Sequence, residues 1–338
     1  MLDSIYNLLD SLHLENPQQY DTLVIFPITG KPPSKRTYLS LSEAMASGTI
    51  KVKEVSKGGS VPELLVKNKG DMPVLMLDGE ELSGAKQNRI LNATILVDAK
   101  SRLVVPVSCT ERGRWAYQTP TFGDSGEIAT TQVRQRKTLS VTENLQAADS
   151  YRSDQGSVWS EIHDLEERTQ VRSPSSAMRD VYEARRKRMT VQMDAFPRHE
   201  NQCGLAVVVS NELRGLDWVS DPQAYVHLHE KLVRSYLVDL PDRAAAESPS
   251  HGNEAFDKFA TMRLHDVLKD LKSAQETVHE SPGLGQDHRL QAQYTFGSAL
   301  VWENGVVHLV AFPSETQAPE RPRHGIAGWR ARRRNRNA

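Results

Sequence analysis

Cysteine is scarce in this chain, which has only Cys109 and Cys203 among 338 residues. Two cysteines far apart in sequence are too few for a disulfide framework and are typical of a reducing compartment. The sequence therefore predicts a cytoplasmic protein held together by its hydrophobic core.

Long apolar runs are also absent, and none approaches the roughly 20 residues that a membrane-spanning helix needs. The first 21 residues have no basic leader and no small-residue cleavage site. Instead Ile5, Leu8, Leu9 and Leu12 recur at helical spacing. We expect a soluble protein that begins with an amphipathic helix within residues 1–21 and does not contact a membrane.

The charge is nearly balanced, with a formal net charge of −1. A polycation made for nucleic acid is thereby disfavoured, although residues 314–338 and the string EARRKRM are basic. The chain has no Walker loop, no G-x-S-x-G elbow, no G-x-G-x-x-G and no zinc-type cysteine spacing. His227 and His229 would point about 200° apart on a helix. No metal site is predicted, and no cofactor is identified.

Short β-type segments are what the first third of the chain does contain. They lie about ten residues apart between Gly- and Pro-containing turns, at 22–28, 37–42, 49–55, 63–68, 73–79, 93–99 and 103–109. A short helix is also compatible with the residues around 41–47. This spacing favours an α/β protein of the α+β type, with a β-rich, mostly antiparallel sheet core and several packed helices.

The second half is more helical. Residues 118–175 are polar and predict a mobile loop with surface helices, and 176–196 predict a basic helix. A strand at 205–211 and a turn at 212–217 follow, and Asp221 before Pro222 marks a helix start. Another helix is predicted from Asn253, and Asn304-Gly305 predicts a hairpin turn. We expect one domain over 22–313, with 118–200 as its variable helical part, and a disordered tail over 314–338.

Polar residues with chemical potential are densest at 79–89. Gly79 and Gly84 bracket two carboxylates, and cationic and amide groups follow directly: Glu80, Glu81, Lys86, Gln87 and Arg89. Arginine and lysine together suit an anionic ligand, and a carboxylate beside them could hold a ribose hydroxyl or a water. A charged surface hairpin whose charges neutralise one another explains the pattern equally well.

The second polar segment is 106–115, where a strand leads into Cys109, Glu111, Gly113, Arg114 and Trp115. Tryptophan beside arginine suits an aromatic base above a phosphate. Cys109 could act as a nucleophile if a neighbouring arginine lowered its pKa. The more common role of such a cysteine and such a tryptophan is to fill the core, and we expect that role for both.

Residues 79–97 and 105–115, which contain the strings GAKQNR and ERGRW, resemble the ADP-ribosylglycohydrolase- and rhodanese-phosphatase-associated domain family. Segments at 203–239 and 299–313 are similar to its closing half, so the resemblance covers about 22–313. It implies a role in the metabolism of NAD or ADP-ribose derivatives, without an established reaction. The positions that carry it are Gly79, Glu80, Gly84, Lys86, Gln87, Arg89, Cys109, Glu111, Gly113, Arg114 and Trp115.

Two functional hypotheses follow, and the sequence leaves open whether the protein is an enzyme. In the first, Arg89 and Arg114 bind the diphosphate of an NAD- or ADP-ribose-type nucleotide and Trp115 stacks on its base. Glu80, Glu81 or Glu111 then orients a ribose or activates water. In the second, the same charged loops dock a non-catalytic scaffold module onto a partner enzyme, since no nucleophile–base pair is recognisable. Nucleic-acid binding through the basic helix and tail is a weaker third interpretation.

Overall fold

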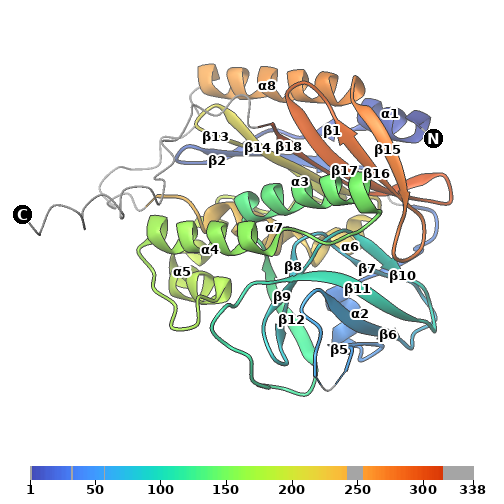
Figure 1. The fold of residues 1–338 in the computed structure, drawn as a ribbon. Coiled ribbons are helices and arrows are strands. Elements are labelled where there is room, and N and C mark those ends of the chain that lie inside the picture. The colour runs from blue at the N-terminus through green and yellow to red at the C-terminus, as the bar shows by residue number, and fades with distance from the viewer. Residues whose placement is uncertain (1, 32, 57, 242–253, 315–338) are drawn as a thin grey trace, which may run out of the picture.

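The computed structural model describes residues 2–31, 33–56, 58–241 and 254–314. Its strands form two β systems on opposite sides of a layer of helices (Figure 1). Among the described residues every strand pair is antiparallel except that of β4 with β7. The predicted α+β class with a mostly antiparallel core is confirmed.

The larger system is a nine-stranded sheet of order β1–β3–β13–β14–β18–β17–β16–β15, in which β2 also pairs with β3. Its strands are β1 (His13–Leu14), β2 (Gln18–Tyr20), β3 (Leu23–Thr29), β13 (Gln202–Val209), β14 (Glu212–Val219), β15 (Gln275–Glu280), β16 (Gln286–Gln291), β17 (Thr295–Trp302) and β18 (Gly305–Pro313). The sheet therefore joins strands from the start of the chain to strands from its second half.

The smaller system is a closed barrel of order β11–β6–β5–β12–β8–β9, with a three-stranded sheet β10–β7–β4 beside it. The barrel strands are β5 (Ile50–Glu54), β6 (Glu63–Asn68), β8 (Glu80–Gly84), β9 (Arg89–Leu91), β11 (Arg102–Cys109) and β12 (Phe122–Ile128). The companion strands are β4 (Leu39–Ser40), β7 (Val74–Met76) and β10 (Ile95–Val97). Closure leaves this barrel without a free strand edge.

The helices lie on the outer face of the large sheet, between the sheet and the barrel, or against the barrel itself. They are α1 (Leu2–Ser11), α2 (Leu41–Ala46), α3 (Thr131–Ala148), α4 (Gln155–Thr169), α5 (Met178–Met193), α6 (Pro222–Val226), α7 (His229–Leu237) and α8 (Glu254–Lys272). Helices α1 and α8 lie on one face of the large sheet and share a hydrophobic cluster with it, whereas α3, α6 and α7 lie between the sheet and the barrel, with α4 and α5 packed beside them (Figure 1). Among the described residues, no helix is both long and apolar enough to cross a membrane.

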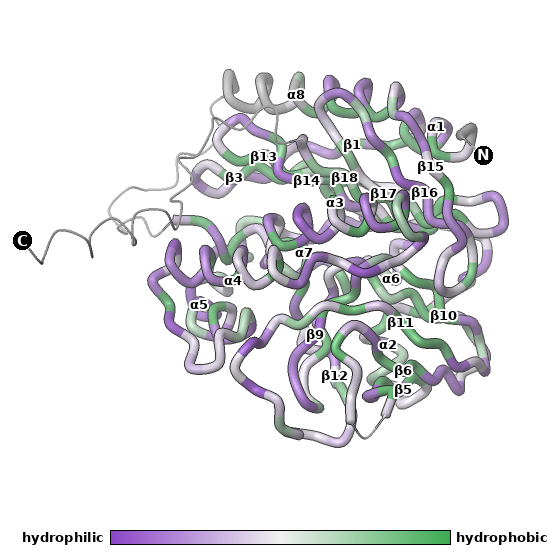
Figure 2. Tube along the Cα trace, viewed as in Figure 1, coloured by the Kyte–Doolittle hydropathy of each residue, from purple (hydrophilic) through white to green (hydrophobic). Residues whose placement is uncertain are grey.

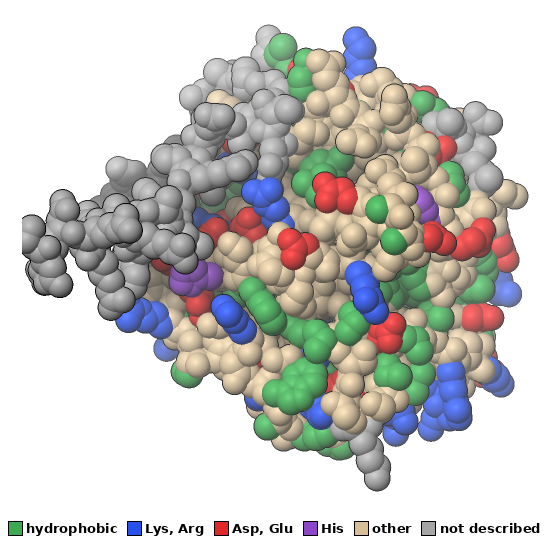
Figure 3. Space-filling view, viewed as in Figure 1, with side chains coloured by type: hydrophobic (Ala, Val, Ile, Leu, Met, Phe, Trp, Pro, Cys, Tyr) green, Lys and Arg blue, Asp and Glu red, His purple; other side chains and the backbone are tan. Residues whose placement is uncertain are grey.

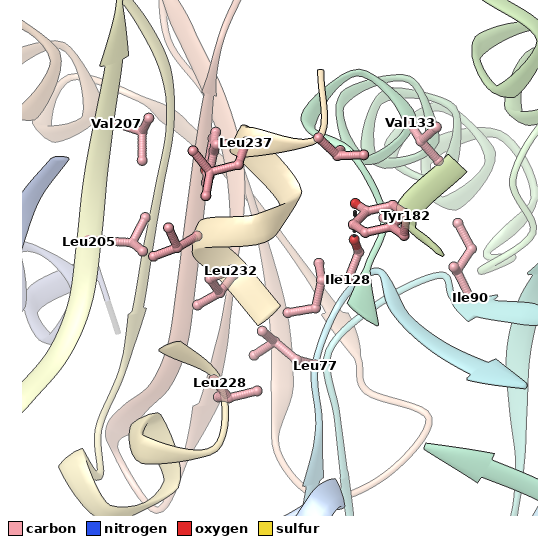
Figure 4. Packing of buried hydrophobic residues seen from close by; sticks show 14 of the residues in the cluster. Leu77, Ile90, Ile128, Val133, Tyr182, Leu205, Val207, Leu228, Leu232 and Leu237 are labelled. Carbon is pink, nitrogen blue, oxygen red and sulfur yellow. Dashed lines mark hydrogen bonds between the residues drawn. The ribbon is translucent and has the colours of Figure 1, made fainter. Parts of the chain in front are cut away.

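The central core connects the two β systems through α7. Figure 4 shows Leu232 and Leu237 of α7 between Leu205 of β13 and Ile128 of β12. Tyr182 of α5 is buried in the same cluster and donates a hydrogen bond of 2.6 Å to the Ile128 carbonyl. The barrel is thus fixed to the sheet by apolar packing together with hydrogen bonds.

The polar segment 118–175 is more ordered than its composition predicted. It contributes β12 and two long helices, and Figure 2 shows many hydrophilic residues along α4. Several of its polar side chains are buried, because they have charged partners. Arg134 of α3 is fully buried and donates to both carboxylate oxygens of Asp217, at 3.0 and 2.6 Å. The helices predicted here are present, whereas the segment has more regular structure than the predicted mobile loop, because buried ion pairs replace apolar contacts.

Two predicted turns lie elsewhere than expected. The residues at 212–217 belong to β14, and the preceding turn is formed by Ser210 and Asn211, both with positive φ. Likewise Trp302 pairs with Gly305, so the β17–β18 turn residues are Glu303 and Asn304. The hairpin itself was predicted correctly, and its turn is shifted by one residue.

Other expectations were met. Asp221 caps α6 with Pro222 in the first turn, although the predicted single helix is divided into α6 and α7. Cys109 and Cys203 are both free and buried. Asn253 and residues 315–338 lie outside the described residues.

The outer barrel wall is basic. Lys51 of β5 lies opposite Lys67 of β6, and Lys67 lies opposite Arg102 of β11. Lysine and arginine side chains gather at the lower right of Figure 3, in the region of the barrel. These neighbouring cations lower the pKa of Lys67, with Arg102 contributing most.

Candidate functional site at the barrel mouth

One end of the barrel collects most of the residues that the sequence singled out. Strands β5, β8 and β11 end there at Glu54, Gly84 and Cys109, and β9 begins there at Arg89. The connections β5–β6, β8–β9 and β11–β12 therefore lie together at this end. We call the cluster of Glu54, Lys86, Arg89, Cys109 and Trp115 the barrel mouth.

Strand alternation turns three of these side chains into the barrel. Val52, Leu91 and Val107 belong to the cluster that fills the barrel interior. Glu54, Arg89 and Cys109 lie two residues from them on their strands and share their face, because side chains alternate along a strand. The last interior layer of the barrel is thus a carboxylate, a guanidinium and a thiol instead of aliphatic groups.

Arg89 is the unusual member of the mouth. Its side chain has no exposed surface. Nη1 donates to Gln87 Oε1 at 3.1 Å and to the Asn88 carbonyl at 3.3 Å. Within the described part of the chain, Nε and Nη2 of Arg89 have no hydrogen-bond partner. Burial lowers the pKa of this guanidinium even though Cys109 and Glu54 act in the opposite direction.

Glu54 is the counterpart that the sequence analysis missed. It is 6% exposed, and its Oε1 accepts a hydrogen bond of 3.4 Å from the Lys86 backbone. Its Oε2 is buried and accepts no hydrogen bond from any described residue. The alternation of Ile50, Val52 and Glu54 was the signal that could have identified it.

Trp115 and Lys86 cover the mouth. The Trp115 ring centroid lies 5.7 Å from Arg89 Cζ and 5.1 Å from Lys86 Nζ. Lys86 Nζ also lies 5.2 Å from the Tyr117 ring and donates to the Gly58 carbonyl at 2.6 Å. Trp115 is 47% exposed, so our expectation of a core tryptophan was wrong. Its ring is held over two cations at the edge of solvent.

Glu111 and Arg114 hold the covering loop in place. Arg114 donates to both Glu111 oxygens, at 2.9 and 2.5 Å, and to the Ala85 carbonyl at 2.8 Å. Burial alone would raise the pKa of Glu111, but these bonds from Arg114 hold it below its ordinary value. Both side chains are engaged with each other, which favours a structural role over direct ligand binding.

The glycines permit close approaches of the chain. Gly84 has a φ of 110°, and an added Cβ would lie 2.3 Å from Thr119 Oγ1. Gly79 also has positive φ, and a Cβ there would meet Arg134 Cγ at 2.9 Å. The backbone N–H of Gly113 donates to the Ser175 carbonyl at 2.7 Å. These positions shape the loops and contribute no side-chain chemistry.

Glu80 and Glu81 lie away from the mouth, near the other end of β8. Glu80 accepts a hydrogen bond of 2.9 Å from Lys231 of α7. Glu81 accepts one of 2.7 Å from Thr110, and burial raises its pKa to about 7. The structure does not bring either carboxylate to the barrel mouth. Lys231 and Asp124 instead form a buried cluster with Glu80, which the sequence did not reveal.

Cys109 is suited to packing. It is 1% exposed, and burial raises the pKa of its thiol despite the opposing effect of Arg89. Its backbone is fixed by the Gln155 side chain, which bonds the Cys109 N–H at 2.7 Å and the carbonyl at 2.9 Å. The core role expected for Cys109 agrees with this geometry, because a neutral thiol is a poor nucleophile.

The fold and site define a mixed α+β protein in which a sheet and a closed barrel share a core, with charged groups lining the barrel mouth. The model of the ARG and Rhodanese-Phosphatase-superfamily-associated Protein domain, ARPP-1, matches residues 11–312, and the chain belongs to this family. Comparison with curated proteins and with solved structures found no match.

Proposed function

We propose that the barrel mouth binds an anionic ligand of the nucleotide type, with the Arg89 guanidinium as the group that holds the anion. The main support is that Arg89 is fully buried and that two of its nitrogens have no hydrogen-bond partner among the described residues. Leaving buried charged nitrogens without acceptors costs roughly several kcal/mol, and an anion bound at Nε and Nη2 would remove that cost. The family name, which associates these domains with ADP-ribosylglycohydrolase and rhodanese-phosphatase enzymes, supports ADP-ribose or NAD derivatives.

Access to Arg89 requires movement of the loop that carries Trp115, because the guanidinium has no exposed surface. A hollow of about 600 Å³ borders this loop and is lined by Tyr117, Gln118, Thr119 and Pro120. Lys86 would add a second positive charge beside the ligand. Trp115 would offer its ring to a base once its loop has moved.

The test is direct binding of ADP-ribose, NAD, AMP and inorganic phosphate by calorimetry, with and without Mg²⁺. Arg89→Gln should weaken binding of the preferred ligand by about tenfold or more, since a charge-assisted hydrogen bond contributes roughly 1.5–3 kcal/mol. Arg102→Gln is the matched control, because Arg102 is exposed at the opposite end of the barrel. Equal binding by Arg89→Gln and the parent protein would refute the proposal.

A second candidate function is docking onto a partner enzyme. It is favoured by two exposed aromatic residues on one loop, Trp115 at 47% and Tyr117 at 53%, and by the family name. If none of the four ligands binds and Trp115→Ser abolishes co-purification of a partner that the parent protein retains, this function replaces the first.

A further inference from the structure

The barrel places Arg89 and Glu54 on opposite walls. In the order β11–β6–β5–β12–β8–β9, strands β5 and β9 are separated by two strands in either direction around the barrel. Both side chains belong to the last interior layer at the same end. A cation and an anion therefore face each other across the barrel mouth.

These opposite charges attract each other, since Glu54 acts to raise the pKa of Arg89, but they make no direct contact. No ion pair joins Arg89 to Glu54 or to any other carboxylate within the described ranges. Arg89 retains unbonded donors at Nε and Nη2, and Glu54 retains an unbonded acceptor at Oε2. Buried polar atoms are nearly always hydrogen-bonded, so two unsatisfied groups in one layer require an explanation.

Arg89 borders the Trp115 ring, and Glu54 borders the space over Gly59 that the same ring also reaches. Arg89 Cζ lies 5.7 Å from the Trp115 ring centroid. An ideal Cβ added at Gly59 would lie 3.4 Å from Glu54 Oε2 and 3.4 Å from Trp115 Cζ2. A molecule that displaces the Trp115 ring and extends over Gly59 would thus reach both the guanidinium and the carboxylate.

We propose, building on the proposed function, that the mouth recognises the phosphorylated sugar end of its ligand, with phosphate on Arg89 and a sugar hydroxyl donating to Glu54. A simple anion bound to Arg89 would leave Oε2 of Glu54 without a hydrogen-bond donor, and it would place a second negative charge beside this carboxylate. A hydroxyl one sugar ring away from the phosphate satisfies that oxygen. Glu54 is then the residue that distinguishes a sugar phosphate from a simple phosphate.

The experiment compares ribose 5-phosphate with methyl phosphate, which has the anion but no hydroxyl, by calorimetry on the full chain. The parent protein should prefer ribose 5-phosphate by about tenfold. Glu54→Met removes the acceptor at similar length and should abolish this preference, so that ribose 5-phosphate binds no more tightly than methyl phosphate. Methyl phosphate itself should bind the variant more tightly than the parent, because a like charge beside the anion is gone. Glu54→Gln keeps one oxygen and should retain part of the preference.

The matched control is Glu63→Met, since Glu63 starts β6 at the same rim, and its neighbour Leu64 occupies the interior face. A preference that survives in Glu54→Met overturns the inference while the anion site stands. The inference is also overturned if the protein binds ADP-ribose through Arg89 but does not bind ribose 5-phosphate. If neither phosphate nor nucleotide binding depends on Arg89, the proposed function fails and this inference fails with it.

Discussion

The ammonium of Lys231 lies 2.9 Å from Glu80 and 2.7 Å from Asp124, and so connects helix α7 to two adjacent barrel strands. All three groups are largely withdrawn from solvent, and Lys231 is 5% exposed. Burial would lower the pKa of Lys231, but the two carboxylates raise it above its ordinary value. The cluster neutralises Glu80, which the sequence placed among the catalytic candidates.

We expect Lys231→Met to lower the free energy of unfolding by about 3–5 kcal/mol, because it leaves two buried carboxylates without their cation. Urea denaturation at pH 7 measures the loss. Lys69→Met, at an exposed lysine directly after β6, is the control and should change little. Adding Glu80→Gln to Lys231→Met should recover part of the stability, and a loss below 1 kcal/mol in the single variant would contradict a structural role.

Asp217 and Arg134 form another buried ion pair, between the large sheet and α3. Burial would raise the pKa of Asp217, but Arg134 holds it well below its usual range. We expect Asp217→Asn to destabilise the protein by about 3–5 kcal/mol at pH 7.

The pH dependence of this loss has a definite sign. A carboxylate with a depressed folded-state pKa contributes stability that is fully present above its unfolded pKa of about 4. That contribution is lost as the pH falls toward the lower folded-state pKa. Denaturation curves at pH 7 and pH 3 should therefore show a smaller difference between Asp217→Asn and the parent at pH 3. A difference that is independent of pH would contradict the assigned ionisation.

The ionisation of Glu81 should lower the free energy of unfolding as the pH rises, whereas that of Asp217 raises it. Burial raises its pKa to about 7, although its hydrogen bond from Thr110 and the charge of Arg179 oppose the shift, and Glu127 is a nearby like charge. A raised carboxyl pKa lowers stability as the pH rises from about 4.5 to about 7, since the unfolded state ionises first. The penalty above pH 7 is at most on the order of 3 kcal/mol, at 1.36 kcal/mol per pKa unit.

Glu81→Gln tests this expectation because glutamine keeps an oxygen that can accept from Thr110. Relative to the parent, the variant should gain stability between pH 5 and pH 8, as measured by urea denaturation. A flat difference for Glu81→Gln would mean that Glu81 does not remain protonated in the folded protein.

Local sequence patterns predicted the strands that bury aliphatic residues on at least one face. Strands β3, β5, β6 and β11 were found from alternation or apolar runs. Strands β8, β9 and β12 were not, because their buried positions include charged residues such as Glu80 and Arg89 whose burial depends on partners. Lys231, the partner of Glu80, is 151 residues away in sequence.

The candidate site was predicted only in part, because the pairing of its charged residues also depends on partners that are distant in sequence. Sequence density located Lys86, Arg89 and Trp115, and strand closure brings them to one barrel end. The sequence cannot show that Arg114 is paired by Glu111 whereas Arg89 has no such partner among the residues that the structure describes. Glu54 was missed because its position opposite Arg89 follows from the order of strands around the barrel, which no local pattern specifies.

Arg89 should be dispensable for folding, which separates it from the other buried cations. A buried guanidinium with two unsatisfied nitrogens destabilises the unliganded protein, and an apolar side chain of similar length removes that cost. We expect Arg89→Met to raise the free energy of unfolding without ligand by on the order of 1–3 kcal/mol, measured by urea denaturation. The same variant should lose the stabilisation that ADP-ribose gives the parent protein.

Arg134→Met is the matched comparison, because Arg134 is equally buried but holds Asp217. It should lower stability by about 3–5 kcal/mol, since it leaves that carboxylate unpaired. Opposite signs for the two variants would indicate that Arg89 is retained at the expense of stability, as expected for a group that serves a ligand. Destabilisation of similar size in both would place Arg89 among the structural cations and remove the main support for the anion site.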